Sequence, residues 1–547
     1  MAVLLALAAP AAAQQQVERV RFPLPADDPG LTPYTFEVNY PLVALVYDTL
    51  AWRDEDGVPR PWLAESIRRQ DDGLTVRIEL RDGARWHDGR PVTARDVAFT
   101  FRHVAERPHP RFTPQVRDIR SVAAIDRDTV LIHLRRPSLG LLDQPLADVP
   151  ILPRHLWSDL PAGEIAPPGL PVGSGPYRLV RHERRRAYEL AAVEDYFRGR
   201  PTVGRIEIPI VRQAHQMAEA LTAGRADAIL AGPAADDLRG PGVDAIAGVS
   251  YAGTLLMLNV AEPPFDRLAV RRAVARALDL ERIARAAGGA STTDGVAPAD
   301  RGYVSPDSPW APDAPLHEFD AAAARVAFAE QGIPPRTVLA PAGNPVALEA
   351  GRHVVAALRR AGGRARLLER SAEAIGRAVG QDGSDPDFQA AILGAPALAS
   401  YDPAFLGALF GSREPLNLSG YRSAAFDRLA ARLSAASSEP SRRQVADALL
   451  RRLARDLPVV PLVYAQAGFA HRPAVFDGWV FVRGTGILDK QSFLRHGGGP
   501  VRRTAAARDP LDALATDETS LLPLVLGGAG LVALAGGVAL FRRGAAR

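Results

Sequence analysis

An uncharged stretch near the C-terminus is the feature that most limits how this chain can fold. It divides the chain into a globular body and a candidate membrane anchor. Residues 521–541 contain no charged side chain, and Arg542 and Arg543 follow at once. As a helix this stretch would cover roughly 31 Å, about one hydrocarbon core of a bilayer. The arginines assign its far end to the cytoplasm by the positive-inside rule. We therefore expect a single transmembrane helix at residues 521–541, a cytoplasmic tail at residues 542–547 and a body outside the cytoplasm.

The N-terminus favours the same topology. Its apolar run is too short to span a bilayer, and residues 11–13 read Ala-Ala-Ala, which suits cleavage by signal peptidase. We expect a signal peptide at residues 1–16. Residues 496–520 are rich in glycine and then in polar side chains, as in a flexible tether. The globular body is then expected to lie between the signal peptide and this tether.

The length and composition of the chain limit what the body can be. At 547 residues the chain exceeds what one hydrophobic core usually organises, so two or more lobes are expected. The 66 basic residues barely exceed the 62 acidic ones, and their interspersion argues against a nucleic-acid partner. The sequence has no cysteine, which excludes disulfides, thiolate metal sites and a lipid-modified N-terminal cysteine.

Periodic patterns along the body predict a mixture of strands and helices. Residues 74–80 alternate apolar and polar side chains, as in a half-buried strand. Thr93 and Asp96 have the spacing of a capping box and predict a helix start. Ser441 and Gln444 predict a second start, and Asp266 is a candidate N-cap for a third helix. Residues 457–464 predict a strand that Pro458 and Pro461 interrupt. The fold class is therefore α/β.

No sequence motif indicates catalysis. The chain lacks the nucleophile elbow, the paired-histidine zinc motif and the phosphate loop. His87 lies in a turn without further metal-binding partners, so we assign it a structural role and expect no metal, cofactor or enzyme activity. The glycines of residues 173–175 lack the lysine and spacing of a phosphate loop, and a chain crossover explains them better.

Several ordered segments resemble the family 5 extracellular solute-binding proteins, the peptide and nickel group of ABC importers. The longest is residues 80–97, LRDGARWHDGRPVTARDV, preceded by PWLAES at residues 61–66. Further similar segments follow in the same order: PVGSGPY at 171–177, LNV at 258–260, PPFD at 263–266, VRRA at 270–273, FDRL at 426–429 and LPVVPL at 457–462. Together they span almost the whole body.

The resemblance implies a large, type II periplasmic-binding-protein fold in which two lobes close on a ligand. Lobe one would contain residues 17–252 and 468–495, and lobe two residues 253–467, so that two strands cross the hinge. It also implies that the protein captures a small ligand, such as a peptide, and delivers it to the permease subunits of an ABC importer. The body would be periplasmic or extracellular and held to the cell membrane by its C-terminal helix.

The resemblance also implies candidate ligand contacts. The loop that binds the ligand's ammonium group in peptide-binding relatives corresponds to residues 394–403, GAPALASYDP. It keeps Tyr401 and Asp402 but lacks the tryptophan and has Ser400 in place of the acidic residue. We expect Tyr401 and Asp402 to reach the cleft from lobe two, opposite Tyr34 and Asn39 from lobe one. The alternative is that Asp402 caps the segment after Pro403 and Tyr401 packs within lobe two.

The sequence leaves the ligand and the function open. The family resemblance makes peptide the leading ligand class, with nickel complexes, sugars, opines and other small solutes as alternatives. A membrane-tethered sensor or chaperone that kept the fold and lost transport is the alternative function, because a fold does not fix a function.

Overall fold

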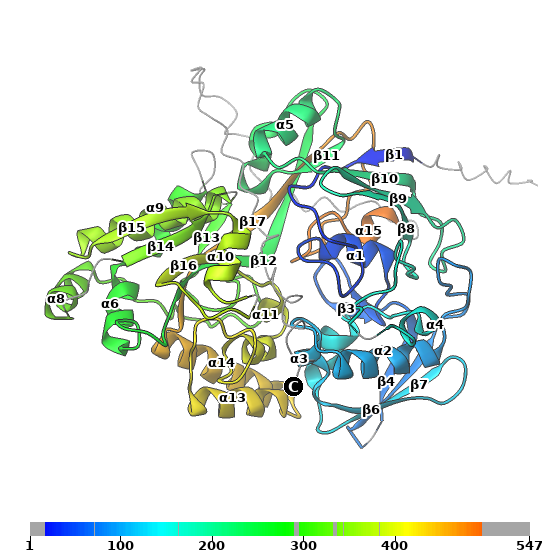
Figure 1. Ribbon diagram of the computed structural model, residues 1–547, viewed down its shortest axis with the longest axis horizontal. Coiled ribbons are helices and arrows are strands. Elements are labelled where there is room, and N and C mark those ends of the chain that lie inside the picture. The colour runs from blue at the N-terminus through cyan, green and yellow to red at the C-terminus, as the bar shows by residue number, and fades with distance from the viewer. Residues whose placement is uncertain are drawn as a thin grey trace, which may run out of the picture.

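The chain folds into two lobes that lie side by side (Figure 1). The structure is a computed structural model, and it describes residues 17–494 except residues 71, 162, 289–294, 332–335, 343 and 382. The expected signal peptide, tether, transmembrane helix and cytoplasmic tail all lie outside the described residues. Within the described part, no helix combines the length and apolar character needed to cross a membrane.

Lobe one contains two four-stranded sheets. In the first, β1 pairs in parallel with β10, and β9 and β8 follow in antiparallel order. These strands are β1 (Val17–Arg21), β10 (Val203–Pro209), β9 (Ala187–Ala192) and β8 (Tyr177–Glu183). Their buried side chains share a core with helix α1 (Tyr40–Val46) and with the last helix, α15 (Lys490–Phe493). The end of the described chain is therefore built into lobe one.

The second sheet of lobe one is antiparallel throughout and has a core of its own. Its order is β4 (Ala64–Arg69), β5 (Thr75–Leu80), β7 (Thr129–Leu134) and β6 (Ile119–Ala124). The expected strand at residues 74–80 is confirmed by β5. Helix α2 (Ala94–Glu106) begins directly after Thr93, as the capping box predicts, and the Asp96 carboxylate accepts bonds from the Thr93 amide at 2.9 Å and hydroxyl at 2.8 Å. A short pair, β2 (Ala51–Arg53) and β3 (Pro59–Pro61), borders this sheet.

A seven-stranded sheet joins the two lobes. Its order is β11 (Ala228–Leu230), β17 (Val459–His471), β12 (Asp244–Leu258), β16 (Ala390–Ala395), β14 (Arg336–Pro341) and β15 (Ala365–Arg370), with β13 (Val296–Pro298) also paired to β17. The long antiparallel strands β12 and β17 run between the lobes (Figure 1). The expected lobe boundaries at residues 252 and 467 fall within these two strands, and they stay a prediction.

Helices pack around the lobe-two part of this sheet and complete two adjoining cores. They are α6 (Leu268–Ala277), α7 (Leu280–Ala287), α8 (Ala321–Gln331), α9 (Pro345–Arg360), α10 (Ala372–Ala378), α11 (Leu398–Tyr401), α12 (Leu406–Phe410), α13 (Ala424–Ser434) and α14 (Glu439–Asp456). Lobe one has the remaining helices α3 (Thr113–Val116), α4 (Arg154–Trp157) and α5 (Ala214–Thr222). The expected α/β, two-lobed architecture is confirmed.

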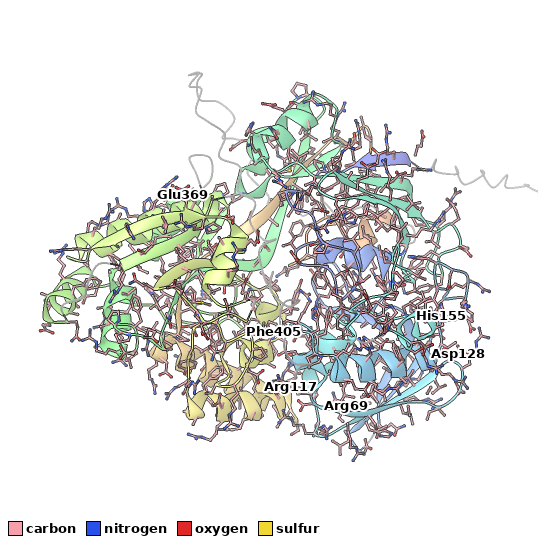
Figure 2. All side chains as sticks on the ribbon, viewed as in Figure 1. Arg69, Arg117, Asp128, His155, Glu369 and Phe405 are labelled. Atoms are coloured by element: carbon pink, nitrogen blue, oxygen red, sulfur yellow. The ribbon has the colours of Figure 1, made fainter. Side chains whose placement is uncertain are left out.

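The two lobes approach each other where α3 faces the loops of lobe two. Arg117, directly after α3, lies at this boundary (Figure 2), and its guanidinium group donates to the Glu414 carboxylate of lobe two. Residues on both sides of the boundary also line a mostly apolar cavity, which is the candidate functional site.

Candidate functional site

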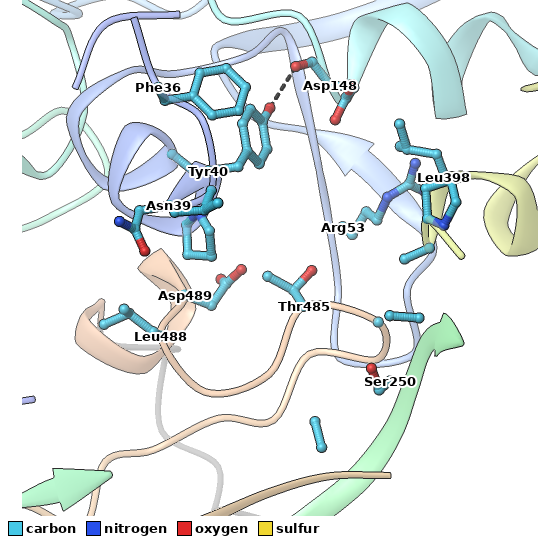
Figure 3. A pocket seen from close by; sticks show the side chains of 18 of the residues that line it. Phe36, Asn39, Tyr40, Arg53, Asp148, Ser250, Leu398, Thr485, Leu488 and Asp489 are labelled. Carbon is cyan, nitrogen blue, oxygen red and sulfur yellow. Dashed lines mark hydrogen bonds between the residues drawn. The ribbon is translucent and has the colours of Figure 1, made fainter. Parts of the chain in front are cut away.

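A cavity of about 190 Å³ lies between the lobes (Figure 3). Lobe one lines it with the segment leading into α1, with β2 and with the segment at residues 484–489 that precedes α15. Lobe two lines it with residues 396–398 and Tyr401, around α11. Because both lobes contribute walls, a molecule in this cavity would contact both and would favour their closed arrangement.

Arg53 lies on β2 at the boundary between the lobes. Its Nη1 donates to Asp143 Oδ1 at 2.8 Å and its Nη2 to the Asp143 carbonyl at 2.9 Å. Its guanidinium carbon lies 3.8 Å from the centre of the Tyr401 ring, a cation–π contact. The Arg53 charge is thus already balanced by Asp143 and covered by an aromatic ring from the other lobe.

Arg111 is neutralised in the same way. It binds Asp148 through Nε at 3.0 Å and Nη2 at 2.6 Å, and its guanidinium carbon lies 4.0 Å from the Tyr40 ring centre. Burial opposes ionisation of Asp148, but the Arg111 charge and its hydrogen bonds outweigh burial and lower the pKa of this carboxyl. The Tyr40 hydroxyl donates to the Asp148 carbonyl at 2.5 Å (Figure 3). This wall of the cavity is therefore fixed and nearly neutral.

Asp489 lines the cavity without a cation of its own. Its side chain is almost fully buried, and both carboxylate oxygens lie 3.2 Å from Trp52 Nε1, while the Gln491 amide donates to Oδ1 at 2.9 Å. No ion pair of Asp489 occurs among the described residues. Burial raises the pKa of this carboxyl to about 6. The fold keeps a carboxyl group here although it is costly to ionise.

The neighbouring Lys490, the only lysine of the chain, turns away from Asp489 to a different carboxylate. Its Nζ donates to Asp48 Oδ1 at 2.9 Å, and both side chains are 0% exposed. The ammonium group also lies 4.4 Å from the ring centre of Trp52 and 5.3 Å from that of Trp62. This buried pair ties α15 to lobe one and fixes the position of the Asp489 backbone.

Asn39, one of the four predicted contacts, lines the cavity just before α1. Its Nδ2 donates to the Ala26 carbonyl at 3.0 Å, and its backbone amide donates to Asp28 Oδ2 at 3.1 Å. The first bond fixes which end of the amide carries the oxygen. Asn39 Oδ1 is buried and has no hydrogen-bond partner in the described structure. An acceptor left in this state is the exception in folded proteins.

Tyr401, the second predicted contact, also lines the cavity. Its hydroxyl donates to the Arg483 carbonyl at 2.5 Å, and its ring packs edge-on against Tyr251 with centroids 5.0 Å apart. Burial raises the pKa of Tyr401 to about 12, so the hydroxyl stays protonated. Since its hydroxyl is occupied, Tyr401 can offer a ligand mainly its ring.

The other two predicted contacts do not line this cavity. Tyr34 packs against His103, His109 and Trp157 in lobe one, and its hydroxyl donates to the Arg107 carbonyl at 2.9 Å. Asp402 forms a buried ion pair with Arg442, 2.7 Å from Asp402 Oδ2 to Nη2, and its Oδ1 accepts the Ala404 amide at 2.9 Å. This geometry matches the alternative interpretation of Asp402, in which its carboxylate caps the segment after Pro403 instead of contacting a ligand.

Both ring nitrogens of His87 contact the backbone of the fold, as expected for a histidine with a structural role in a turn. The Gly173 amide donates to His87 Nδ1 at 3.2 Å, and Nε2 lies 3.0 Å from the Gly175 carbonyl. Burial lowers the pKa of His87 to about 4, so the ring is neutral at pH 7. Gly175 in turn packs on the α1 backbone so closely that a Cβ would lie 2.3 Å from the Leu45 carbonyl. The described residues contain no cluster of three side chains able to hold a metal ion.

Sequence reasoning missed Asp489, Arg53 and Arg111 as parts of the site. Asp489 contacts Trp52 across 437 positions of sequence, and no local pattern distinguishes it from other carboxylates. The surrounding motif, a cap for the short α15, accounts for an aspartate at this position by itself. Nothing in the sequence pairs these residues.

Comparison with known proteins decides the family. The model for bacterial extracellular solute-binding proteins, family 5, matches residues 58–417. The chain belongs to this family. By its description, this is a family of extracellular solute-binding proteins.

Curated family 5 relatives match parts of the chain. A Brucella ovis protein named as an ABC transporter peptide-binding protein is 30% identical over 251 residues, which cover 44% of this chain and 47% of that protein. Oligopeptide-binding protein AppA of Bacillus subtilis is 27% identical over 185 residues, 33% of this chain and 34% of that one. The aligned part of this chain thus spans about half the length of these relatives or less.

Solved structures of other proteins share the fold of this chain. The Bacillus subtilis AppA structure with a nonapeptide has a TM-score of 0.78 and 21% identity, and covers 88% of this chain and 99% of that chain. The Campylobacter jejuni NikZ structure with Ni(L-His) has a TM-score of 0.74 and 20% identity, covering 83% and 94%. Proteins of one fold therefore hold ligands of different chemistry, and the ligand of this chain has to be inferred from its own residues.

Proposed function

We propose that this protein captures a small solute in the cavity between its lobes and delivers it to the permease subunits of an ABC importer. The carrying observation is that both lobes line this cavity, with Asn39 and Arg53 on one side and Leu398 and Tyr401 on the other. Ligand contacts to both sides stabilise the closed arrangement, which is the form that a transporter can distinguish from the empty protein.

The proposed contacts differ from the set that the sequence indicated. Asn39 and Tyr401 stay as ligand contacts, because both line the cavity. Tyr34 and Asp402 are assigned to the fold, since their polar atoms are satisfied elsewhere. A peptide is the leading candidate ligand, as the names of the relatives above indicate for those proteins. A cavity of about 190 Å³ favours a short peptide over a long one.

The experiment that tests capture is mass spectrometry of small molecules released when the purified protein is denatured. We expect one compound in a ratio near one to one with the protein. Calorimetry with that compound should then give weaker binding for Tyr401→Ala, which removes the aromatic wall. Recovery of no compound, together with capture of an unfolded protein instead, would favour the sensor or chaperone alternative.

We further propose that residues 521–541 anchor the body on the outer face of the cell membrane, with residues 1–16 as the export signal. The uncharged run and the arginines after it support this proposal. Protease added to spheroplasts should then release the body, and a chain ending at Ser520 should be soluble. A body protected in intact spheroplasts would contradict the proposed orientation.

A further inference from the structure

The carboxyl and amide groups of the cavity wall that have no cation or no hydrogen-bond donor are acceptors. Asn39 Oδ1 is buried and unpartnered, and the Asp489 carboxylate has hydrogen-bond donors around it but no cation. Glu37 also lines the cavity, and burial raises the pKa of its carboxyl. A ligand that satisfies these groups must bring hydrogen-bond donors and positive charge.

The cations of the cavity wall do not supply that charge. Arg53 is bound to Asp143 and Arg111 to Asp148, so each positive charge has its own carboxylate. Lys490, next to Asp489 in sequence, binds Asp48 and lies between two indole rings. Moving its ammonium group to Asp489 would leave Asp48 buried without a cation. The wall therefore has a surplus of negative charge centred on Asp489.

Lobe two contributes a wall of different character. Pro396, Ala397 and Leu398 are apolar, and the Tyr401 hydroxyl is already bound to the Arg483 carbonyl. The open acceptors all belong to lobe one. A ligand that fits both walls would turn its charged end to lobe one and an apolar face to lobe two.

We propose that Asp489 and Asn39 form a subsite on lobe one for a cationic amine of the ligand. The inference rests on the proposed function, because it names the class of solute that the cavity takes. Asp489 would accept from the ammonium group as a carboxylate and Asn39 Oδ1 would accept a second N–H. The cation would also favour ionisation of Asp489, whose pKa burial otherwise raises to about 6. This subsite differs from the lobe-two loop at residues 394–403, whose carboxylate is bound to Arg442.

The test uses the full chain in detergent and a panel of small amines, each paired with a neutral isostere. Leucinamide with 4-methylpentanamide is one such pair, since they differ by the amino group alone. Binding is followed by thermal shift and calorimetry on the wild type, on Asp489→Asn and on Asp477→Asn. Asp477 is an exposed carboxylate on the same C-terminal segment and does not line the cavity. The Asn side chain at position 489 keeps an oxygen that can accept from Trp52 or Gln491.

We expect amines to bind and their neutral partners not to. Asp489→Asn should weaken amine binding by about 30-fold or more, the effect of removing one partner of a desolvated charge pair, and Asp477→Asn should leave it unchanged. Preference for neutral or anionic compounds, or equal amine binding by the wild type and Asp489→Asn, would overturn the subsite while leaving solute capture intact. Failure of every compound class, with no co-purified molecule, would instead count against solute capture itself.

Discussion

Arg117 in lobe one and Glu414 in lobe two form a bidentate ion pair across the boundary between the lobes. Arg117 Nη1 lies 2.5 Å from Glu414 Oε1, and Nη2 lies 2.7 Å from Oε2. Both residues lie outside the lining of the cavity. The pair therefore belongs to the arrangement in which the lobes approach each other, and it lies outside the proposed solute cavity.

Glu414→Gln should weaken ligand binding indirectly, by favouring separation of the lobes. Because Arg117 is half exposed, we expect a loss of up to about 1 kcal/mol, or about fivefold in Kd. The salt dependence of binding should fall as well. Glu281→Gln, which breaks an exposed pair with Arg285 on α7 inside lobe two, is the matched control. Equal effects of the two variants would show that the Arg117 pair does not link ligand binding to closure.

Asp402→Asn should lower stability and leave ligand affinity unchanged. The change removes the charge that balances Arg442, and both side chains are about 5% exposed or less. Breaking a buried pair by removing one partner costs about 3 kcal/mol or more. Thermal unfolding and calorimetry on the same sample separate the two effects. Weaker affinity at an unchanged melting temperature would restore Asp402 as a ligand contact.

Thr93→Ala should destabilise the protein by about 1 kcal/mol through loss of the cap of α2. The Asp96 carboxylate would lose its bond from the Thr93 hydroxyl but keep the backbone amide of Arg154, which donates to Oδ1 at 3.0 Å. Neither residue lines the cavity, so ligand affinity measured by calorimetry should not change. A loss of affinity without a loss of stability would contradict the assignment of this motif to the fold.

Asp489 should make the ligand-free protein more stable at mildly acid pH. Its pKa is raised to about 6 in the folded protein from 3.8, so between these values the folded state holds a proton that the unfolded chain has lost. Stability contributed by this group is present below pH 4 and lost as the pH rises to 6, by about 3 kcal/mol in total.

Other buried groups titrate in the same range, so the measurement has to be a difference. Burial lowers the pKa of His87 and of His103 to about 4, which makes stability rise with pH and opposes the Asp489 effect. Denaturant unfolding of the wild type and of Asp489→Asn from pH 4 to pH 7.5 isolates the carboxyl. The variant should gain stability relative to the wild type as the pH rises, and a constant difference would contradict a raised pKa.

Local sequence patterns predicted strands and some helix starts. They failed where neighbouring structure decides the residue at which a helix begins. The expected capping box at Ser441 was wrong, because α14 begins at Glu439 after the cap Ser438, with Pro440 in its first turn. Asp266 is likewise not the cap of α6, which begins at Leu268 after Arg267. In both cases a competing start lay within three residues of the predicted one.

The strand expected at residues 457–464 begins and ends later than predicted, because β17 starts at Val459 and continues through Pro461 to His471. The register of β12 on β17 shifts between Thr254 and Leu255, and Leu255 is the partner of Pro461. An irregularity at this point accommodates a residue that lacks an N–H. Such an irregularity depends on the partner strand and has no signal near Pro461 itself.

The candidate site was less predictable than the fold. The family motifs indicated two lobes and a cleft, and they led to Asn39 and Tyr401, which line the cavity. They could not indicate that Asp402 forms an ion pair with Arg442, nor that Trp52 donates a hydrogen bond to Asp489 at the cavity wall. These contacts join distant segments and depend on how the lobes pack.

A crystal structure of the full chain with its co-purified solute would show directly whether the solute binds between the lobes. We expect electron density for a small molecule there, in contact with Asn39 and Asp489 on one side and with Leu398 and Tyr401 on the other. Density at another site, or closed lobes around an empty cavity in protein that holds a stoichiometric solute, would contradict it.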